Sequence, residues 1–127
     1  MCNPVTDMVS RTDSMIKELS LHRTGYGMLI DLVEMELSNL LINHPSLKAD
    51  IYLLMEIKKT LIRSIVYASS QIKNIDRMRK LLSEMTDDTI TIQMCEDINM
   101  VSEIVKEIRE PEWFFTKIKK IFNKFNF

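Results

Sequence analysis

The sequence is poor in residues that end helices and in residues that cross-link small domains. Its 127 residues include only two glycines, three prolines and two cysteines. Cys2 and Cys95 do not form the framework of paired cysteines found in small secreted proteins, so we interpret both as free thiols of a reducing compartment. The scarcity of glycine and proline leaves few points at which a helix has to end. The composition therefore favours helices held together by a hydrophobic core.

Long apolar runs are missing as well. The longest run without Asp, Glu, Lys or Arg covers residues 37–47 and contains two asparagines and a proline, whereas a membrane-spanning helix needs about 20 apolar residues. Residues 1–20 carry several charged side chains at positions where a signal peptide would be apolar. We therefore expect an intracellular, cytoplasmic protein with no signal peptide and no transmembrane segment.

Residues suited to catalysis or metal binding are also scarce. The only histidines are His22, at the expected end of a helix, and His44, which precedes a proline. Neither has the spacing to a cysteine that zinc sites use. Three glutamates between residues 103 and 110 have helical spacing, but a lysine and an arginine between them indicate a solvated face. We predict that the protein is not an enzyme and that it has no catalytic residues, no cofactor and no metal.

Apolar residues recur every three or four positions along most of the chain, which is the pattern of helices with one buried face. Gly25 and Gly27 are expected to end the first helix, which starts near Pro4, and Pro45 to end the second. A third helix begins at Ser46 and either fades near residues 68–70, with a further helix from Asn74, or continues to residue 85. Another begins at residue 88 or 89. We predict an all-α, single-domain bundle of five or six helices over residues 1–127.

The most regular apolar pattern lies in the second last of these helices. Its apolar residues step 4, 4, 3, 4 and 3 along the chain, close to the heptad spacing of coiled coils. The pattern spans less than three heptads. We regard it as a candidate oligomer seam formed by Ile90, Met94, Ile98, Val101, Val105 and Ile108.

Nearly all large aromatic side chains are gathered at the C-terminus. The only tryptophan and all five phenylalanines lie in residues 113–127, among four lysines. After Pro111 this segment is predicted to form a basic, aromatic amphipathic helix over residues 112–127. It either packs onto the bundle or onto a second copy of the chain, the default expectation, or contacts a partner or a membrane. The candidate contact residues are Trp113, Phe114, Phe115, Lys117, Ile118, Lys120, Ile121, Phe122, Lys124 and Phe125.

These patterns predict a non-enzymatic protein–protein interaction module that acts through apolar helix faces as an adaptor, inhibitor, regulator or chaperone-like partner. We expect a homodimer or a hetero-complex. One alternative is a peripheral membrane protein that uses helix 112–127. Another is a nucleic-acid-associated regulator that uses the basic stretch 58–80, although a pI near 6.1 disfavours it. The excess of isoleucine over leucine and of lysine over arginine suggests an AT-rich coding sequence, as in a virus or an AT-rich bacterium.

Overall fold

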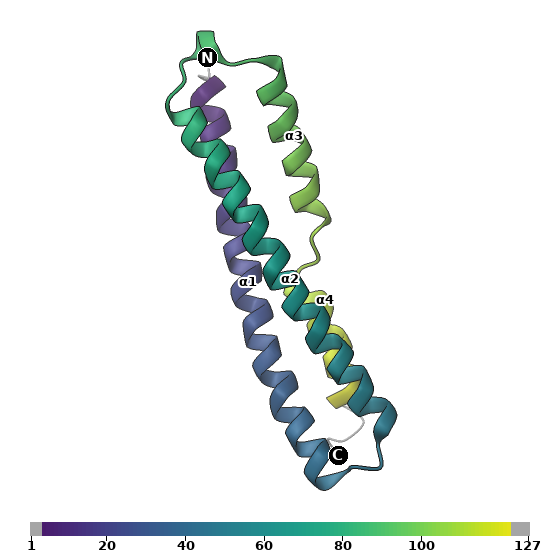
Figure 1. Ribbon diagram of the computed structural model, residues 1–127. Helices are drawn as coiled ribbons and strands as arrows, with labels where there is room; N and C mark the ends of the chain where they lie inside the picture. The colour runs from purple at the N-terminus through teal and green to yellow at the C-terminus, as the bar shows by residue number, and fades with distance from the viewer. Residues whose placement is uncertain (1–3, 123–127) are drawn as a thin grey trace. The chain divides into compact units, whose positions relative to one another are not determined.

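The computed structural model describes residues 4–122, and this part of the chain is all-α. Four α-helices and a short 3-10 helix follow one another, with no strand among the described residues: α1 (Pro4–Asn43), α2 (Lys48–Ser83), η1 (Asp87–Thr89), α3 (Ile92–Glu107) and α4 (Pro111–Phe122) (Figure 1). The predicted fold class is confirmed. The predicted number of five or six helices is wrong, because two expected breaks are absent.

The first absent break is at the two glycines. Gly25 and Gly27 lie inside α1, which continues to Asn43. A glycine inside a helix costs about 1 kcal/mol relative to alanine, which packing can outweigh. At Gly25 the missing side chain is itself required, because a Cβ there would lie 2.5 Å from Cγ of Pro111. This glycine permits a close helix contact and does not end the helix.

The second absent break is near residue 70. α2 is continuous from Lys48 to Ser83 and passes through the polar segment after Ala68 that was expected to interrupt it. Ala68 is fully buried, so the helix packs here through a small side chain. Of the two interpretations of residues 46–85, the single long helix is therefore correct.

The chain divides into two compact units. Unit 1 contains the described residues up to Leu21 together with Ala68–Arg109, and unit 2 contains His22–Tyr67 together with the described residues from Glu110 onward. Each unit has a segment of α1 and a segment of α2, which α3 completes in unit 1 and α4 in unit 2. The single-domain organisation of residues 1–127 stays a prediction.

The core of unit 1 takes up the regular stripe that had been considered an oligomer seam. Ile98 and Val105 are buried in it, and Ile90, Met94, Val101 and Ile108 are partly buried against it. Packing within the unit therefore accounts for the heptad-like spacing without a second chain. The core residues are Met8, Met15, Leu19, Ile75, Leu82, Ile98 and Val105.

Local hydrogen bonds fix where α3 begins. Thr91 is its N-cap and accepts a hydrogen bond from the backbone N–H of Met94 at 3.2 Å. Such a cap contributes about 1 kcal/mol. The helix thus starts at Ile92, a few residues later than the sequence pattern indicated, because Asp87–Thr89 form the 3-10 helix.

The core of unit 2 joins three helices. α1 supplies five buried residues at helical spacing, α2 supplies three and α4 supplies three. They are Tyr26, Leu29, Val33, Leu37, Leu40, Leu54, Ile57, Leu61, Phe114, Ile118 and Ile121. Within residues 4–122, none of the helices has the length and apolar composition that a membrane crossing needs.

Candidate interaction surface

α4 begins where the sequence predicted. Pro111 is its first residue, a position that needs no backbone N–H donor. Glu112 lies in the first turn and two lysines lie in the last turn, so the charged side chains at both ends interact favourably with the helix dipole. Pro111 thus separates α4 from the preceding segment and also suits the first position of α4.

The inner face of α4 belongs to the core of unit 2. Phe114, Ile118 and Ile121 are buried, and the Phe114 ring packs edge-on against Tyr26, with 5.7 Å between ring centroids. Trp113 makes a similar edge contact with Phe114, at 4.9 Å. Three of the predicted contact residues therefore face inward, and in this fold they are not accessible to a partner or a membrane.

The remaining predicted contact residues of α4 lie on its flanks or outside the described residues. Trp113 and Phe115 are each about two-fifths exposed, and a lysine covers each ring: Lys117 Nζ lies 4.7 Å from the Trp113 ring and Lys119 Nζ lies 5.2 Å from the Phe115 ring. Both rings are therefore partly exposed although each has a cation–π contact. Lys120 is exposed and Phe122 is half-buried. Lys124 and Phe125 lie outside the described residues.

Tyr26 stays neutral over the physiological pH range. Burial raises the pKa of its phenol above the usual value of 10.0, and the carboxylates of Glu110 and Glu112 raise it further. A phenol held in this way does not serve as a base or a nucleophile at neutral pH. We assign Tyr26 to packing, in line with its ring contact with Phe114.

Sequence reasoning missed a second apolar stripe on α1. Met28, Leu32, Met35 and Ile42 are exposed, and their spacing with Asn39 is 4, 3, 4 and 3 residues. The exposed fractions of Met28, Met35 and Ile42 are 65%, 71% and 77%. The sequence contains two interleaved apolar patterns of helical spacing, one from Tyr26 to Leu40 and one from Met28 to Ile42. Only the first of them is buried.

Only the edge of the outer stripe that contains Leu32 lies in line with the place where α1 meets α4. Gly25 contacts Pro111, and Leu32 follows Gly25 by two helical turns on the same side of α1. Phe115 follows Pro111 by one turn on the same side of α4. We call the outer stripe of Met28, Leu32, Met35, Asn39 and Ile42, together with the exposed Phe115 of α4, the α1/α4 flank. None of these residues is charged, and the carboxylate of Glu36 beside them accepts a hydrogen bond from the Asn39 side chain at 3.4 Å.

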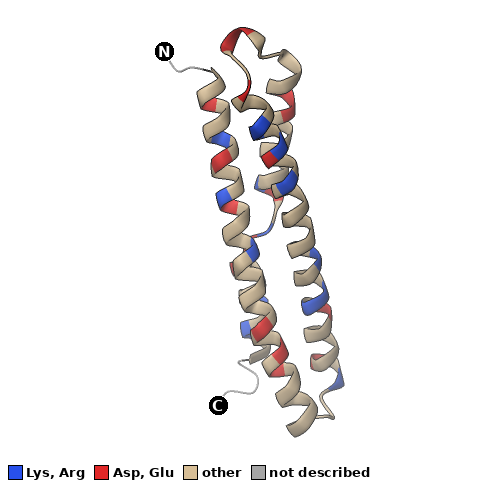
Figure 2. Ribbon diagram, turned by 60° about the vertical axis from the view of Figure 1, so that its left-hand side comes forward, with Lys and Arg blue, Asp and Glu red and all other residues tan. Residues whose placement is uncertain are grey.

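The basic stretch 58–80 is largely engaged with acidic residues. In unit 2, Lys58 pairs with Glu34 at 3.1 Å and Lys59 pairs with Glu56 at 3.3 Å. In unit 1, Arg79 bridges Asp13 and Asp76, and Lys80 also pairs with Asp76. Figure 2 shows acidic positions beside the basic ones on these helices. These pairs weaken the case for a phosphate-binding track.

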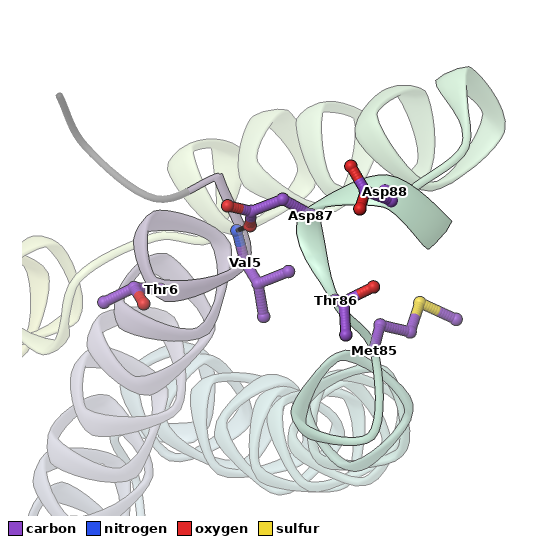
Figure 3. A pocket seen from close by; sticks show the side chains of 6 residues that line it. All are labelled: Val5, Thr6, Met85, Thr86, Asp87 and Asp88. Atoms are coloured by element: carbon purple, nitrogen blue, oxygen red, sulfur yellow. Dashed lines mark hydrogen bonds between the residues drawn. The ribbon is translucent and has the colours of Figure 1, made fainter.

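A shallow pocket of about 460 Å³ lies at one end of unit 1, lined by Val5, Thr6 and residues 85–88 (Figure 3). Its carboxylate Asp87 accepts a hydrogen bond from the backbone N–H of Val5 at 3.2 Å and so caps the start of α1. That contact gives Asp87 a structural role. Among the described residues, no cluster of His, Cys, Asp and Glu side chains is suited to a metal ion.

The two histidines do not add a chemical site. His22 is half-buried and its ring packs 6.3 Å from the ring of Tyr26. His44 is exposed in the turn between α1 and α2, where its backbone N–H donates to the Leu40 carbonyl. Comparison of the chain with protein-family models, with curated proteins and with solved structures gives no match.

Proposed function

We propose that this chain is a non-enzymatic protein–protein interaction module and that the α1/α4 flank of unit 2 binds an apolar α-helix of a protein partner. The observation that carries the proposal is the uncharged outer stripe of α1, whose residues lie opposite the buried residues of the same helix segment. Contiguous apolar patches on isolated soluble proteins commonly mark binding sites.

The energetics suit a reversible complex. Burying a fully exposed Met, Leu or Ile side chain gives about 1.5–3 kcal/mol, and Met28, Leu32, Met35 and Ile42 are 65%, 38%, 71% and 77% exposed, so covering them gives roughly 4–8 kcal/mol before the entropy cost of association. A micromolar complex needs about 8 kcal/mol net. Phe115 and neighbouring contacts would have to offset the remaining cost, so we expect a dissociation constant in the micromolar range or weaker if the stripe acts alone.

The spacing of the stripe favours a helix as the partner. Leu32 and Asn39 are seven residues apart, and Met28, Met35 and Ile42 also follow one another at intervals of seven. The two sets match the a and d positions of a heptad. A polar asparagine at one such position sets register at some cost in stability. The methionines provide the adaptable surface that accepts more than one apolar helix. A second copy of the chain is one such partner and a different protein is the other.

The two other functions considered have less support. A membrane anchor built on helix 112–127 would need its apolar face free, whereas Phe114, Ile118 and Ile121 pack inside unit 2. A nucleic-acid site on residues 58–80 would need unpaired cations, whereas several of them form ion pairs. The uncharged α1/α4 flank suits neither ligand.

A pair of variants tests the proposal. Leu32→Lys with Met35→Glu places charges in the stripe, and Leu41→Lys places one on a different side of α1, since residue 41 is also exposed. Both proteins should keep the helical circular dichroism and thermal transition of the parent. The first should lose the complex formed through the stripe, measured by rebinding of a purified partner for a hetero-complex and, for self-association, by light scattering at about 0.5 M salt, where contacts between charged surfaces are screened. Retention of every complex by the first variant would refute the proposal.

A further inference from the structure

A second surface of unit 2, on α2, combines positive charge with apolar side chains. Tyr52 and Val66 are each about two-thirds exposed, and Met55 and Ile62 are nearly half exposed. These residues recur at helical spacing with three exposed basic residues, and no Asp or Glu belongs to the set. We call this surface the basic α2 face; its members are Lys48, Tyr52, Met55, Lys59, Ile62, Arg63 and Val66.

Unit 1 carries a surface of opposite charge on α3. Ile92 is 80% exposed and Met100 is 62% exposed, although the opposite side of the same helix is buried. Three exposed glutamates share the outer side with them at steps of three and four residues. Lys106 lies beside this set and pairs with Glu103 at 3.4 Å. We call Ile92, Glu96, Met100, Glu103 and Glu107 the acidic α3 face.

The part of the basic α2 face from Lys48 to Arg63 matches the acidic α3 face in length. Residues 48–63 and residues 92–107 each span about 22 Å of helix. Each face has an exposed methionine near its middle, Met55 on α2 and Met100 on α3, with charged residues toward both ends. When the two helices are laid side by side in parallel with Met55 opposite Met100, Glu103 and Glu107 fall within one residue of Lys59 and Arg63, and Glu96 falls beside Tyr52. Opposite charges around an apolar centre are the usual arrangement of a specific interface.

We propose that the acidic α3 face of one copy of this chain docks on the basic α2 face of a second copy. The contact joins two different surfaces, so in a pair one copy keeps an unused basic α2 face and the other keeps an unused acidic α3 face, and assembly continues with concentration unless the rotation closes a ring. An anionic lipid surface would also attract the lysines, but it has no side chains spaced to match Met55 and its flanking cations. The proposal uses a surface separate from the α1/α4 flank and stands or fails independently of it.

Charge exchange between two variants tests this contact. The first variant, Lys59→Glu with Arg63→Glu, makes the basic α2 face acidic; the second, Glu103→Lys with Glu107→Lys, makes the acidic α3 face basic. All four positions are exposed, and the existing pairs Lys59–Glu56 and Glu103–Lys106 are surface pairs of low strength. Circular dichroism and thermal unfolding of each purified variant establish that it is folded.

The parent protein should show concentration-dependent association by analytical ultracentrifugation that weakens at least tenfold between about 0.05 M and 0.5 M salt. Each variant alone should associate at least tenfold more weakly than the parent, and an equimolar mixture of the two should associate again. Leu32→Lys with Met35→Glu, which changes only the α1/α4 flank, should leave this salt-sensitive association intact.

Several outcomes would overturn the proposal. One is a parent protein that stays monomeric at low salt, and another is a mixture that fails to associate although both variants are folded. Binding of the parent to phosphatidylserine vesicles without self-association would assign the basic α2 face to lipid. If a variant fails to fold, Met55→Lys and Met100→Lys replace the pair, and unchanged association of both would equally refute the contact.

Discussion

Gly25 on α1 and Pro111 at the start of α4 approach so closely that a Cβ on the glycine would lie 2.5 Å from the proline Cγ. The two residues are far apart in the sequence but belong to the same unit. Their contact sets how α4 lies on α1, and with it which aromatic residues of α4 reach the core. A contact this short tolerates no added atom without a shift of one helix.

Gly25→Ala should therefore destabilise the protein, although alanine is the better helix former. The overpacking penalty of about 1–3 kcal/mol exceeds the gain of about 1 kcal/mol in helix propensity. Gly27→Ala is the matched control, because nothing lies within 4 Å of a Cβ at that position, and it should stabilise by about 0.5–1 kcal/mol. Urea unfolding of both variants measures the difference. Equal stabilisation by both would show that the contact is absent.

Phe114→Ala should cost about 3–5 kcal/mol of unfolding free energy, because the ring is buried and packs against both Tyr26 and Trp113. The neighbouring Phe115→Ala removes a ring of the same size that is 38% exposed, and it should cost markedly less. Thermal unfolding followed at 222 nm compares the two. Similar losses for both residues would contradict the assignment of the inner face of α4 to the core.

The ion-pair cluster of unit 1 should make stability sensitive to acid. Hydrogen bonding to Lys80, with a further contribution from Arg79, lowers the pKa of Asp76 below its usual 3.8. Because the folded state favours the carboxylate, this contribution is present above the usual pKa of aspartate and is lost as the pH falls through the lower, folded-state value. Below about pH 4, the urea concentration at the unfolding midpoint should depend less on pH in Asp76→Asn than in the parent protein. Parallel curves for parent and variant would reject the linkage.

Tyr26 should make the stability of the fold sensitive to alkaline pH. Its pKa is raised, first by burial and then by Glu110 and Glu112, so the folded state keeps the phenol protonated where the unfolded chain ionises. The stabilisation is complete below the usual value of 10.0 and declines as the pH rises from there to the folded-state pKa. Tyr26→Phe should reduce the alkaline fall in the unfolding midpoint. An identical fall in the variant would assign it to other groups.

The sequence predicted those features that depend on local chemistry. Helical periodicity gave the all-α class, and Pro45 and Pro111 were correctly identified as points where the chain leaves or enters a helix. The expected break at Gly25 was wrong because the reason for this glycine is a contact with Pro111, which no local pattern reveals. The length of α2 was left open because polar side chains near residue 70 are compatible with either outcome.

Surface assignment was harder to predict for a related reason. On α1, the stripes that contain Leu29 and Leu32 both have helical spacing, and packing against α2 and α4 determines that the first is buried and the second is exposed. The terminal helix has one apolar face and two aromatic flanks, so the single set of predicted contact residues divides between core and surface. Periodicity identifies an apolar face, but only the tertiary arrangement identifies what covers it.

Site-specific photo-cross-linking tests the proposed binding flank most directly. A photoreactive amino acid replaces Met35 in one protein and Leu41 in another, since both side chains are exposed on α1 but on different sides of the helix. Each protein is irradiated in the cells that produce it, and cross-linked peptides are identified by mass spectrometry. We predict that position 35 cross-links to an apolar helical segment of one protein, either a second copy or another chain, and that position 41 does not. Equal labelling at both positions, or only lipid adducts at position 35, would contradict the account.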